Sequence, residues 1–302
     1  MSQSSTDRVV LGIGLMIGCC TTAPLLDVAS KLAAEEIPVG QITTARFVVQ
    51  AVLMLPVLWI LKFPLRFSPK LLPKMALRAL FLLTSTYCFV AAIAVMPIAD
   101  ALAIVFVEPF ILLLLGKWLF QEQVGIRRLG ASIVGFVGVC LVIQPSLAVF
   151  GLVALYPLGT AVSLAFYMLI TRSLSKDINP VPMQLHTAVL GSAMCLPILV
   201  AAHGLDIPSL APVMPQGIFW LWLFGVGLWA SISHMMMSFA LKFAPSATLA
   251  PLHYLEIVTA LILGYVIFSD FPNTLALVGT AIIVASGLYV FHREQVLERQ
   301  SA

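Results

Sequence analysis

Long apolar stretches separated by short polar segments run along the whole chain. The segments 79–99 and 271–291, for example, contain no charged residue. A helix rises 1.5 Å per residue, so roughly 20 residues are needed to cross about 30 Å of hydrocarbon. Each of these stretches therefore predicts one transmembrane helix.

Turn-forming residues divide the stretches that are too long for one helix. The stretch 129–171 is interrupted by Gln144-Pro145-Ser146 and predicts two helices, and 207–241 begins with a proline-rich loop. The segment before the first stretch is too short and too weakly basic for a cleaved signal, so we expect that stretch to be retained. We predict an all-α polytopic membrane protein with ten transmembrane helices, near residues 9–33, 39–62, 75–96, 98–119, 126–144, 149–172, 181–202, 216–242, 246–268 and 273–292.

The composition supports this class. Hydrophobic residues make up 61% of the 302 positions and charged residues only 10%, with a mean hydropathy of +1.07. Soluble domains carry about 25% charged residues. A soluble enzyme, a nucleic-acid-binding protein and a disordered protein are therefore excluded, and the lipid bilayer is the expected surrounding. The five cysteines lie in apolar runs without metal-ligand spacing, so we predict buried thiols, no metal site and no cofactor.

The basic residues predict the orientation. If the N-terminus is cytoplasmic, 14 of the 16 Lys and Arg residues lie in cytoplasmic segments or at adjacent helix ends, Arg78 among them, and only Lys31 and Arg46 do not. Cytoplasmic loops of membrane proteins carry an excess of Lys and Arg. Both termini are therefore predicted to be cytoplasmic, in a bacterial-type inner membrane.

The two halves of the chain resemble each other. Pairs of matching residues recur at an offset of 148 and, after one inserted residue, of 149: Pro97 and Pro245, Glu108 and Glu256, Gly116 and Gly264, Phe120 and Phe268, Gly130 and Gly279, Gly138 and Gly287. The halves are 9–144 and 149–292, with five predicted helices each. Because each half has an odd number of helices, the second half has the opposite orientation in the membrane. Inverted repeats of this kind are typical of secondary transporters.

Several motifs resemble the drug/metabolite transporter superfamily, in its ten-helix branch with two EamA domains. They are Met96-Pro97-Ile98-Ala99-Asp100-Ala101, Val107-Glu108-Pro109, the glycines Gly130 to Gly138, and Tyr254-Leu255-Glu256 followed by Gly264-Tyr265 and Phe268. Asp27-x-x-x-Lys31 followed by Arg46 is similar to the group that includes S-adenosylmethionine and riboflavin carriers.

The resemblance implies a secondary transporter of a small polar or amphipathic metabolite that works by alternating access, as a monomer or a homodimer. An amino-acid or drug exporter of the same superfamily is the alternative. An intramembrane enzyme or a channel is the alternative of another class, but the chain has no HExxH, GxGD or GxSxG motif and nothing similar to a filter loop. We therefore predict no catalytic residues.

Two carboxylates are predicted near the middle of the membrane. Glu108 lies ten residues after Ile98, roughly 15 Å along a helix, and Glu256 lies at the matching depth of the ninth predicted helix. Charges inside a span cost about 2.5–3.5 kcal/mol each, so they are functional candidates by default. One interpretation is a pair that binds protons or a cation and couples transport to it. The other is a pair of hydrogen-bonded carboxyls that fixes helix packing.

A second charged group is expected near the outer face. Asp27 and Lys31 share one helix face at a spacing of four residues, and Arg46 must lie inside its span. Asp100 is the candidate to balance the surplus positive charge. Arg46 can bind a substrate carboxylate through two parallel hydrogen bonds, and the alternative for Lys31 is an ion pair that closes the outer mouth.

Polar and aromatic side chains complete the predicted binding site for the small-molecule substrate. Ser231, His234 and Ser238 form a polar stripe on the eighth predicted helix, and such a stripe must face protein or a water-filled cavity. His253 lies one turn before Glu256, which is too few ligands for zinc. The aromatic side chains that can add walls for a planar ligand, or simply pack in the core, are Tyr87, Tyr167, Trp229 and Tyr254.

Overall fold

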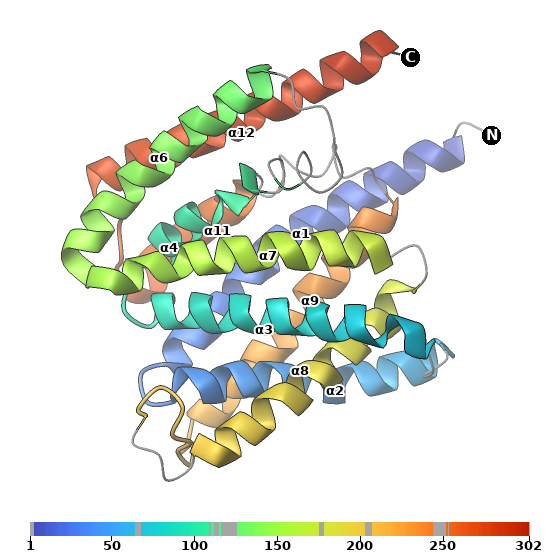
Figure 1. Cartoon of the computed structure of the whole chain (residues 1–302), viewed down its shortest axis with the longest axis vertical. Coiled ribbons are helices and arrows are strands. Elements are labelled where there is room, and N and C mark those ends of the chain that lie inside the picture. The colour runs from blue at the N-terminus through green and yellow to red at the C-terminus, as the bar shows by residue number, and fades with distance from the viewer. Residues whose placement is uncertain are drawn as a thin grey trace.

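The structure is a computed structural model, and it consists of helices joined by short loops (Figure 1). It describes residues 3–63, 68–108, 110–111, 115, 126–174, 178–202, 207–243, 252 and 254–301, and these contain no β-strand. The α-helices are α1 (Gln3–Ala33), α2 (Val39–Ile60), α3 (Leu72–Ile93), α4 (Ile98–Val105), α6 (Ile126–Phe150), α7 (Tyr156–Leu174), α8 (Pro180–Ala202), α9 (Phe219–Phe243), α11 (Tyr254–Phe268) and α12 (Thr274–Ser301). Two short 3-10 helices, η1 (Pro69–Leu71) and η2 (Gly151–Leu155), precede α3 and α7. The predicted all-α class is confirmed.

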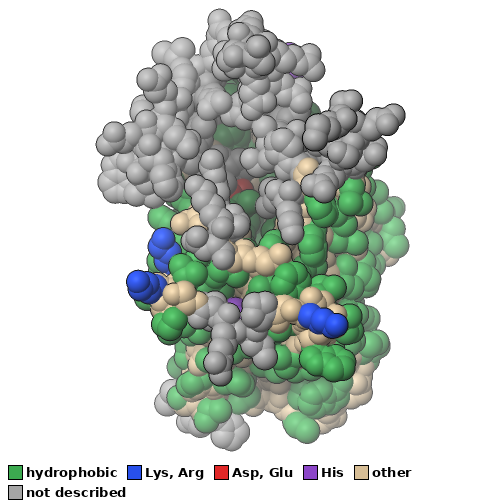
Figure 2. Space-filling view, turned by 90° about the vertical axis from the view of Figure 1, so that its right-hand side faces the viewer, with side chains coloured by type: hydrophobic (Ala, Val, Ile, Leu, Met, Phe, Trp, Pro, Cys, Tyr) green, Lys and Arg blue, Asp and Glu red, His purple; other side chains and the backbone are tan. Residues whose placement is uncertain are grey.

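The helices are long and apolar enough for a multi-pass membrane protein. Six stretches of the described residues meet the length and hydropathy needed to cross a bilayer, and two further apolar helices are shorter. One of the six, Ile133–Thr171, includes both α6 and α7. Hydrophobic side chains cover most of the described surface in Figure 2, and Trp59 and Val266 are 82% and 71% exposed. Such exposure is expected of side chains that face lipid.

Proline and asparagine mark where several helices begin. Pro38 and Pro97 stand directly before α2 and α4, where a missing N–H costs nothing because the first helical N–H groups have no partner within the helix. Asn179 and Asn273 accept hydrogen bonds from the N–H groups of Val181 and Ala276. These contacts satisfy donors at the starts of α8 and α12.

The predicted interruption at Gln144-Pro145-Ser146 is wrong. Helix α6 continues through these residues to Phe150, and the chain turns at Gly151, whose φ of 64° is the left-handed conformation that glycine adopts readily. Figure 1 shows the sharp reversal between α6 and α7. The turn is therefore set by a glycine rather than by the proline before it.

The predicted continuous span 98–119 is also interrupted. Helix α4 ends at Val105, and Phe106 and Val107 form a turn before helical structure resumes at Glu108. Helix α11 begins at Tyr254, so that Glu256 lies in its first turn. Both candidate carboxylates therefore lie next to a helix end.

The helices pack in pairs that join the two halves of the chain. Helix α1 packs on α9, α3 on α7, α2 on both α8 and α9, and α6 on α12. In Figure 1 the pair α6 and α12 lies at the top, and both ends of the chain lie on the same side of the bundle.

Two glycines allow α6 and α12 to approach closely. A Cβ atom on Gly279 would lie 2.6 Å from the carbonyl oxygen of Gly138, and one on Gly138 would lie 2.9 Å from the carbonyl oxygen of Gly279. Real Cβ atoms do not come this close to backbone atoms. Close backbone contact through small residues is a common way for membrane helices to associate.

Gly279→Ala is therefore expected to push α6 and α12 apart and to destabilise the protein by about 1–3 kcal/mol. Gly130→Ala is the matched control, because a Cβ on Gly130 meets nothing within 4 Å. Thermal unfolding in detergent should show a lower midpoint for the first variant and an unchanged or slightly higher one for the second, since alanine favours helix. Equal midpoints would show that this crossing has no part in stability.

The orientation can be tested with cysteines at opposite ends of α2. The loop after α8 lies at the start of α2, because the N–H of Gly40 donates to the carbonyl of Ser209 and Gln41 bonds to Val213. Lys70 follows the other end of α2. In a cysteine-free background we expect Met214→Cys to react with an impermeant thiol reagent added outside and Lys70→Cys to resist it. Met214 is suitable because it is 78% exposed. The reverse pattern would overturn the predicted orientation.

Candidate functional site

Arg46 joins three helices in the middle of the bundle. Its side chain leaves α2, is only 4% exposed, and donates hydrogen bonds to the hydroxyl of Thr86 on α3 and to Nε2 of His234 on α9, the latter at 2.9 Å. Its Nε has no hydrogen-bond partner among the described residues. The prediction that Arg46 lies inside its span is confirmed.

The contact with Arg46 determines where His234 carries its proton. A guanidinium only donates hydrogen bonds, so Nε2 of His234 must accept this one. The ring is then neutral with its proton on Nδ1. That atom is buried and has no hydrogen-bond partner in the described part of the chain. His234 thus offers an unused donor inside the protein.

A second arginine, Arg78, is buried deeper than Arg46. It is fully buried on α3 and donates to the hydroxyls of Thr171 and Tyr167 on α7 and of Thr187 on α8, at 2.8 Å to Thr171 and 2.7 Å to Tyr167. Its guanidinium also lies 4.5 Å from the centre of the Tyr167 ring. The sequence analysis did not identify Arg78 as a site candidate, because it counted this residue among those of the cytoplasmic segments and adjacent helix ends. In the structure it lies in the second turn of α3, with its side chain buried against α7 and α8.

The two arginines belong to one group. The ring of Tyr167 meets the ring of His234 edge to face, with centres 6.4 Å apart, and the charges of both Arg46 and Arg78 act on His234. We call Arg46, Arg78, Thr86, Tyr167 and His234 the central polar cluster. It draws side chains from α2, α3, α7 and α9, and therefore from both halves of the chain.

Asp27 lies beside this cluster without forming the predicted contact with Lys31. It is 7% exposed on α1, and the charges of Glu256 and Arg46 act on it. No ion pair of Asp27 occurs among the described residues. Its carboxyl group therefore interacts electrostatically with two substrate-site candidates, Arg46 and Glu256.

Lys31 forms an ion pair with a residue that the sequence analysis did not assign to it. Its Nζ lies 2.7 Å from Oδ2 of Asp270, donates to the carbonyl of Met96 at 3.1 Å, and lies 4.8 Å from the centre of the Phe268 ring. Asp100 is buried nearby and interacts electrostatically with both Lys31 and Asp270. This ion pair ties the end of α1 to the end of α11. The hypothesis of a closing ion pair therefore gains a partner, Asp270, in place of Asp27.

The two candidate carboxylates are not joined by any contact among the described residues. Oε1 of Glu108 is buried without a hydrogen-bond partner there, and Glu256 acts electrostatically on Asp27 and on the thiols Cys19 and Cys20 of α1. The facing pair of carboxylates stays a prediction.

The other predicted site residues are less well connected. Tyr87 and Trp229 are half-buried, and their side chains make no hydrogen bond among the described residues. Thr86, next to Tyr87, is the residue of this turn that reaches Arg46. His253 and the side chain of Tyr254 lie outside the described residues. The described residues contain no group of three or more His, Cys, Asp and Glu side chains that can hold a metal.

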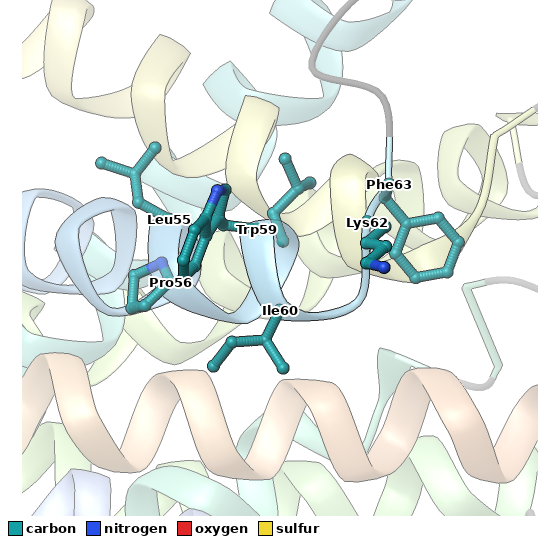
Figure 3. A pocket seen from close by; sticks show the side chains of 7 residues that line it. Leu55, Pro56, Trp59, Ile60, Lys62 and Phe63 are labelled. Carbon is teal, nitrogen blue, oxygen red and sulfur yellow. The ribbon is translucent and has the colours of Figure 1, made fainter.

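A surface hollow of about 890 Å³ lies at the end of α2 and is not part of this site (Figure 3). Its lining comes from the last two turns of α2 and the residues after them: Leu55, Pro56, Leu58, Trp59, Ile60, Lys62 and Phe63. It starts nine residues after Arg46, roughly 14 Å along the helix. Trp59 and Lys62 are typical of a helix end at the membrane interface.

A multi-pass helical protein that buries a hydrogen-bonded cluster of polar side chains has the construction of a membrane transporter. The chain belongs to the EamA-like transporter family, which matches residues 10–144 and again residues 151–291. It is accordingly a secondary transporter of small metabolites and not an enzyme.

Relatives of known name agree with this family. The chain is 25% identical to an S-adenosylmethionine uptake transporter of Rickettsia bellii, over 94% of both chains. It is 28% identical to a riboflavin transporter of Rhizobium johnstonii, over 71% of this chain and 68% of the relative. A solved crystal structure with 16% sequence identity has a TM-score of 0.63 and covers 97% of this chain and 99% of its own. That similarity shows a shared fold.

The ion pair between Lys31 and Asp270 should contribute to stability. Lys31→Met and Asp270→Asn are each expected to lower the unfolding midpoint, and the double variant should lose less than the sum of the two. We expect a coupling energy of about 1 kcal/mol, because both side chains are partly exposed. Lys70→Met, at an exposed position, is the control. Strictly additive effects would show that the two charges do not stabilise each other.

Proposed function

We propose that the protein carries its substrate by alternating access between two inverted repeats, 9–144 and 149–292, with ten transmembrane helices in an inner membrane and both termini in the cytoplasm. The observation that carries the proposal is the double match of one transporter family to the two halves of the chain. Two such repeats can rock against each other around a site between them.

The helix pairs support this arrangement. If each helix of the first half is exchanged for its counterpart in the second, the contact between α1 and α9 becomes the contact between α7 and α3. In the same way α2 with α9 becomes α8 with α3, and α1 with α11 becomes α7 with α4. The pairs α2 with α8, α4 with α11 and α6 with α12 are exchanged with themselves. A two-fold relation between the repeats requires that each such contact be matched by an equivalent contact after the exchange.

The substrate site is proposed to include the central polar cluster. The first half contributes Arg46, Thr86 and Arg78, and the second contributes Tyr167 and His234. A site shared by both repeats changes its access when they move. Asp27, Glu256 and the half-buried aromatic residues Tyr87 and Trp229 remain candidates for the same site, with His253 and Tyr254.

The substrate class is a small polar or amphipathic metabolite. The relatives are named for S-adenosylmethionine and for riboflavin, two compounds that share a ring system linked to a polar chain. An amino-acid or drug exporter of the same superfamily is the alternative. Thermal-shift screening of purified protein separates these classes, because a compound that binds only the folded state raises its stability.

Glu256, assisted by Glu108, is the proposed coupling residue. Both lie next to a helix end, as do the ion-binding groups of transporters with interrupted helices. Glu256 acts electrostatically on Asp27, which in turn interacts with Arg46. A proton on Glu256 therefore changes the charge next to the proposed substrate site, and protons are the proposed coupling ion.

Glu256→Gln is expected to abolish transport against a gradient while leaving folding, substrate binding and counterflow exchange intact. Glutamine keeps the shape and hydrogen bonding of a protonated carboxyl but cannot release a proton. Glu108→Gln should show a milder loss. The measurement is proton-driven uptake and counterflow in proteoliposomes with a compound identified by the screen.

Glu36→Gln is the control, since Glu36 is an exposed carboxylate in the loop before α2 and is not part of the cluster. If Glu256→Gln concentrates the compound as well as the wild type does, the carboxyl is structural and proton coupling through it is wrong. If the wild type shows no saturable uptake of any bound compound, alternating access itself is wrong.

A further inference from the structure

The positive charge of Arg78 has no carboxylate partner in the described part of the chain. Its three hydrogen-bond acceptors are neutral hydroxyls, and the ion pair that the described residues contain joins Lys31 to Asp270 elsewhere. An unpaired charge in a fully buried position is costly even when it is hydrogen-bonded. Neutral hydrogen bonds orient the guanidinium without cancelling its charge.

Arg46 also has no carboxylate as a hydrogen-bond partner among the described residues. Its acceptors are the hydroxyl of Thr86 and the neutral ring of His234, and Asp27 acts on it only through space. Its Nε has no acceptor among the described residues, and the side chain is only 4% exposed. The cluster therefore contains two buried positive charges. Asp27, which is not part of the cluster, is an acidic residue whose charge acts on Arg46.

Unused donors in the cluster point to an acceptor that is not part of the protein. Nδ1 of His234 carries a proton and has no partner among the described residues. The hydroxyl oxygen of Tyr167 accepts from Arg78, which leaves its own proton to be donated. Two positive charges and several donors favour an anion, and guanidinium groups bind carboxylate and phosphate especially well.

We infer that the central polar cluster binds an anionic group of the transported metabolite, a carboxylate or a phosphate, through Nε of Arg46 and Nδ1 of His234. The inference rests on the proposed function and deepens it by naming the chemical class of the substrate. Arg78 is a positioning residue in this site: it holds Tyr167, which packs on His234, and it supplies the second positive charge. It contacts no substrate itself.

Two pairs of compounds test the inference, because the members of each pair differ only in an anionic group. S-adenosylmethionine is compared with decarboxylated S-adenosylmethionine, and flavin mononucleotide with riboflavin. Equilibrium binding is measured with the purified full-length protein in detergent. In at least one pair we expect the anionic member to bind at least tenfold more tightly, since hydrogen bonds to charged groups contribute about 1.5–3 kcal/mol.

Variants separate charge from structure. Arg46→Lys keeps the charge but loses the planar donor set, and should weaken binding of the anionic member about tenfold. Arg78→Gln should reduce the preference for the member with the anionic group about tenfold and leave the affinity for riboflavin, the uncharged member of the flavin pair, unchanged. Arg78→Lys should restore part of the preference. Lys31→Gln is the control, because it removes a cation that is already paired with Asp270.

The results also distinguish this inference from the proposed function. It is overturned if the members without the anionic group bind as tightly as those with it, or if no member with the anionic group binds. It is also overturned if Arg78→Gln weakens both members of a pair equally, as a purely structural role would. Where Arg78→Gln does not fold, the wild-type preference and the Arg46→Lys result decide. Preferential binding of an anion without flux in proteoliposomes would reject transport but keep the anion site. Flux without a preference for the anionic member would reject the anion site but keep transport.

Discussion

A guanidinium inside a bilayer must find its hydrogen-bond partners within the protein or on a bound molecule. Among the described residues, the helices supply a partner to each nitrogen of Arg78 and to every nitrogen of Arg46 except Nε. Arg46 connects α2 to α3 and α9, and Arg78 connects α3 to α7 and α8. Five helices from both halves of the chain are thereby held at one centre. Losing Arg46 would remove the bonds that join α2 to α3 and α9, and losing Arg78 would remove those that join α3 to α7 and α8.

The sequence predicted the elements of the fold better than their ends. Hydropathy alone identified helical spans and the all-α class, because a bilayer admits few other structures. The turn between α6 and α7 was misplaced, since Pro145 is tolerated inside α6 and Gly151 makes the reversal. The interruption of α4 after Val105 was also missed, because Phe106 and Val107 are as apolar as the residues around them.

Several charged residues of the candidate site could be named from the sequence, but their contacts could not. Arg46, Asp27 and His234 were identifiable because charged and polar residues inside an apolar run need a reason. The partners of Lys31 and Arg46 are distant in the sequence, at Asp270 and His234, so spacing could not reveal them. Arg78 was missed because it follows Lys70 and Lys74 and looked like part of a cytoplasmic basic segment.

Two of the polar contacts that cross between the halves of the chain differ in their charge balance. At the ends of α1 and α11, Lys31 meets a carboxylate at 2.7 Å, and the side chains are 15% and 30% exposed. In the centre, Arg78 is fully buried and donates to hydroxyl groups, with no carboxylate partner among the described residues. A balanced pair needs nothing further, whereas a surplus charge in a low-dielectric interior attracts any anion that reaches it more strongly than water does. The unequal balance therefore supports the proposal that the central polar cluster, rather than the contact between Lys31 and Asp270, binds the anionic group.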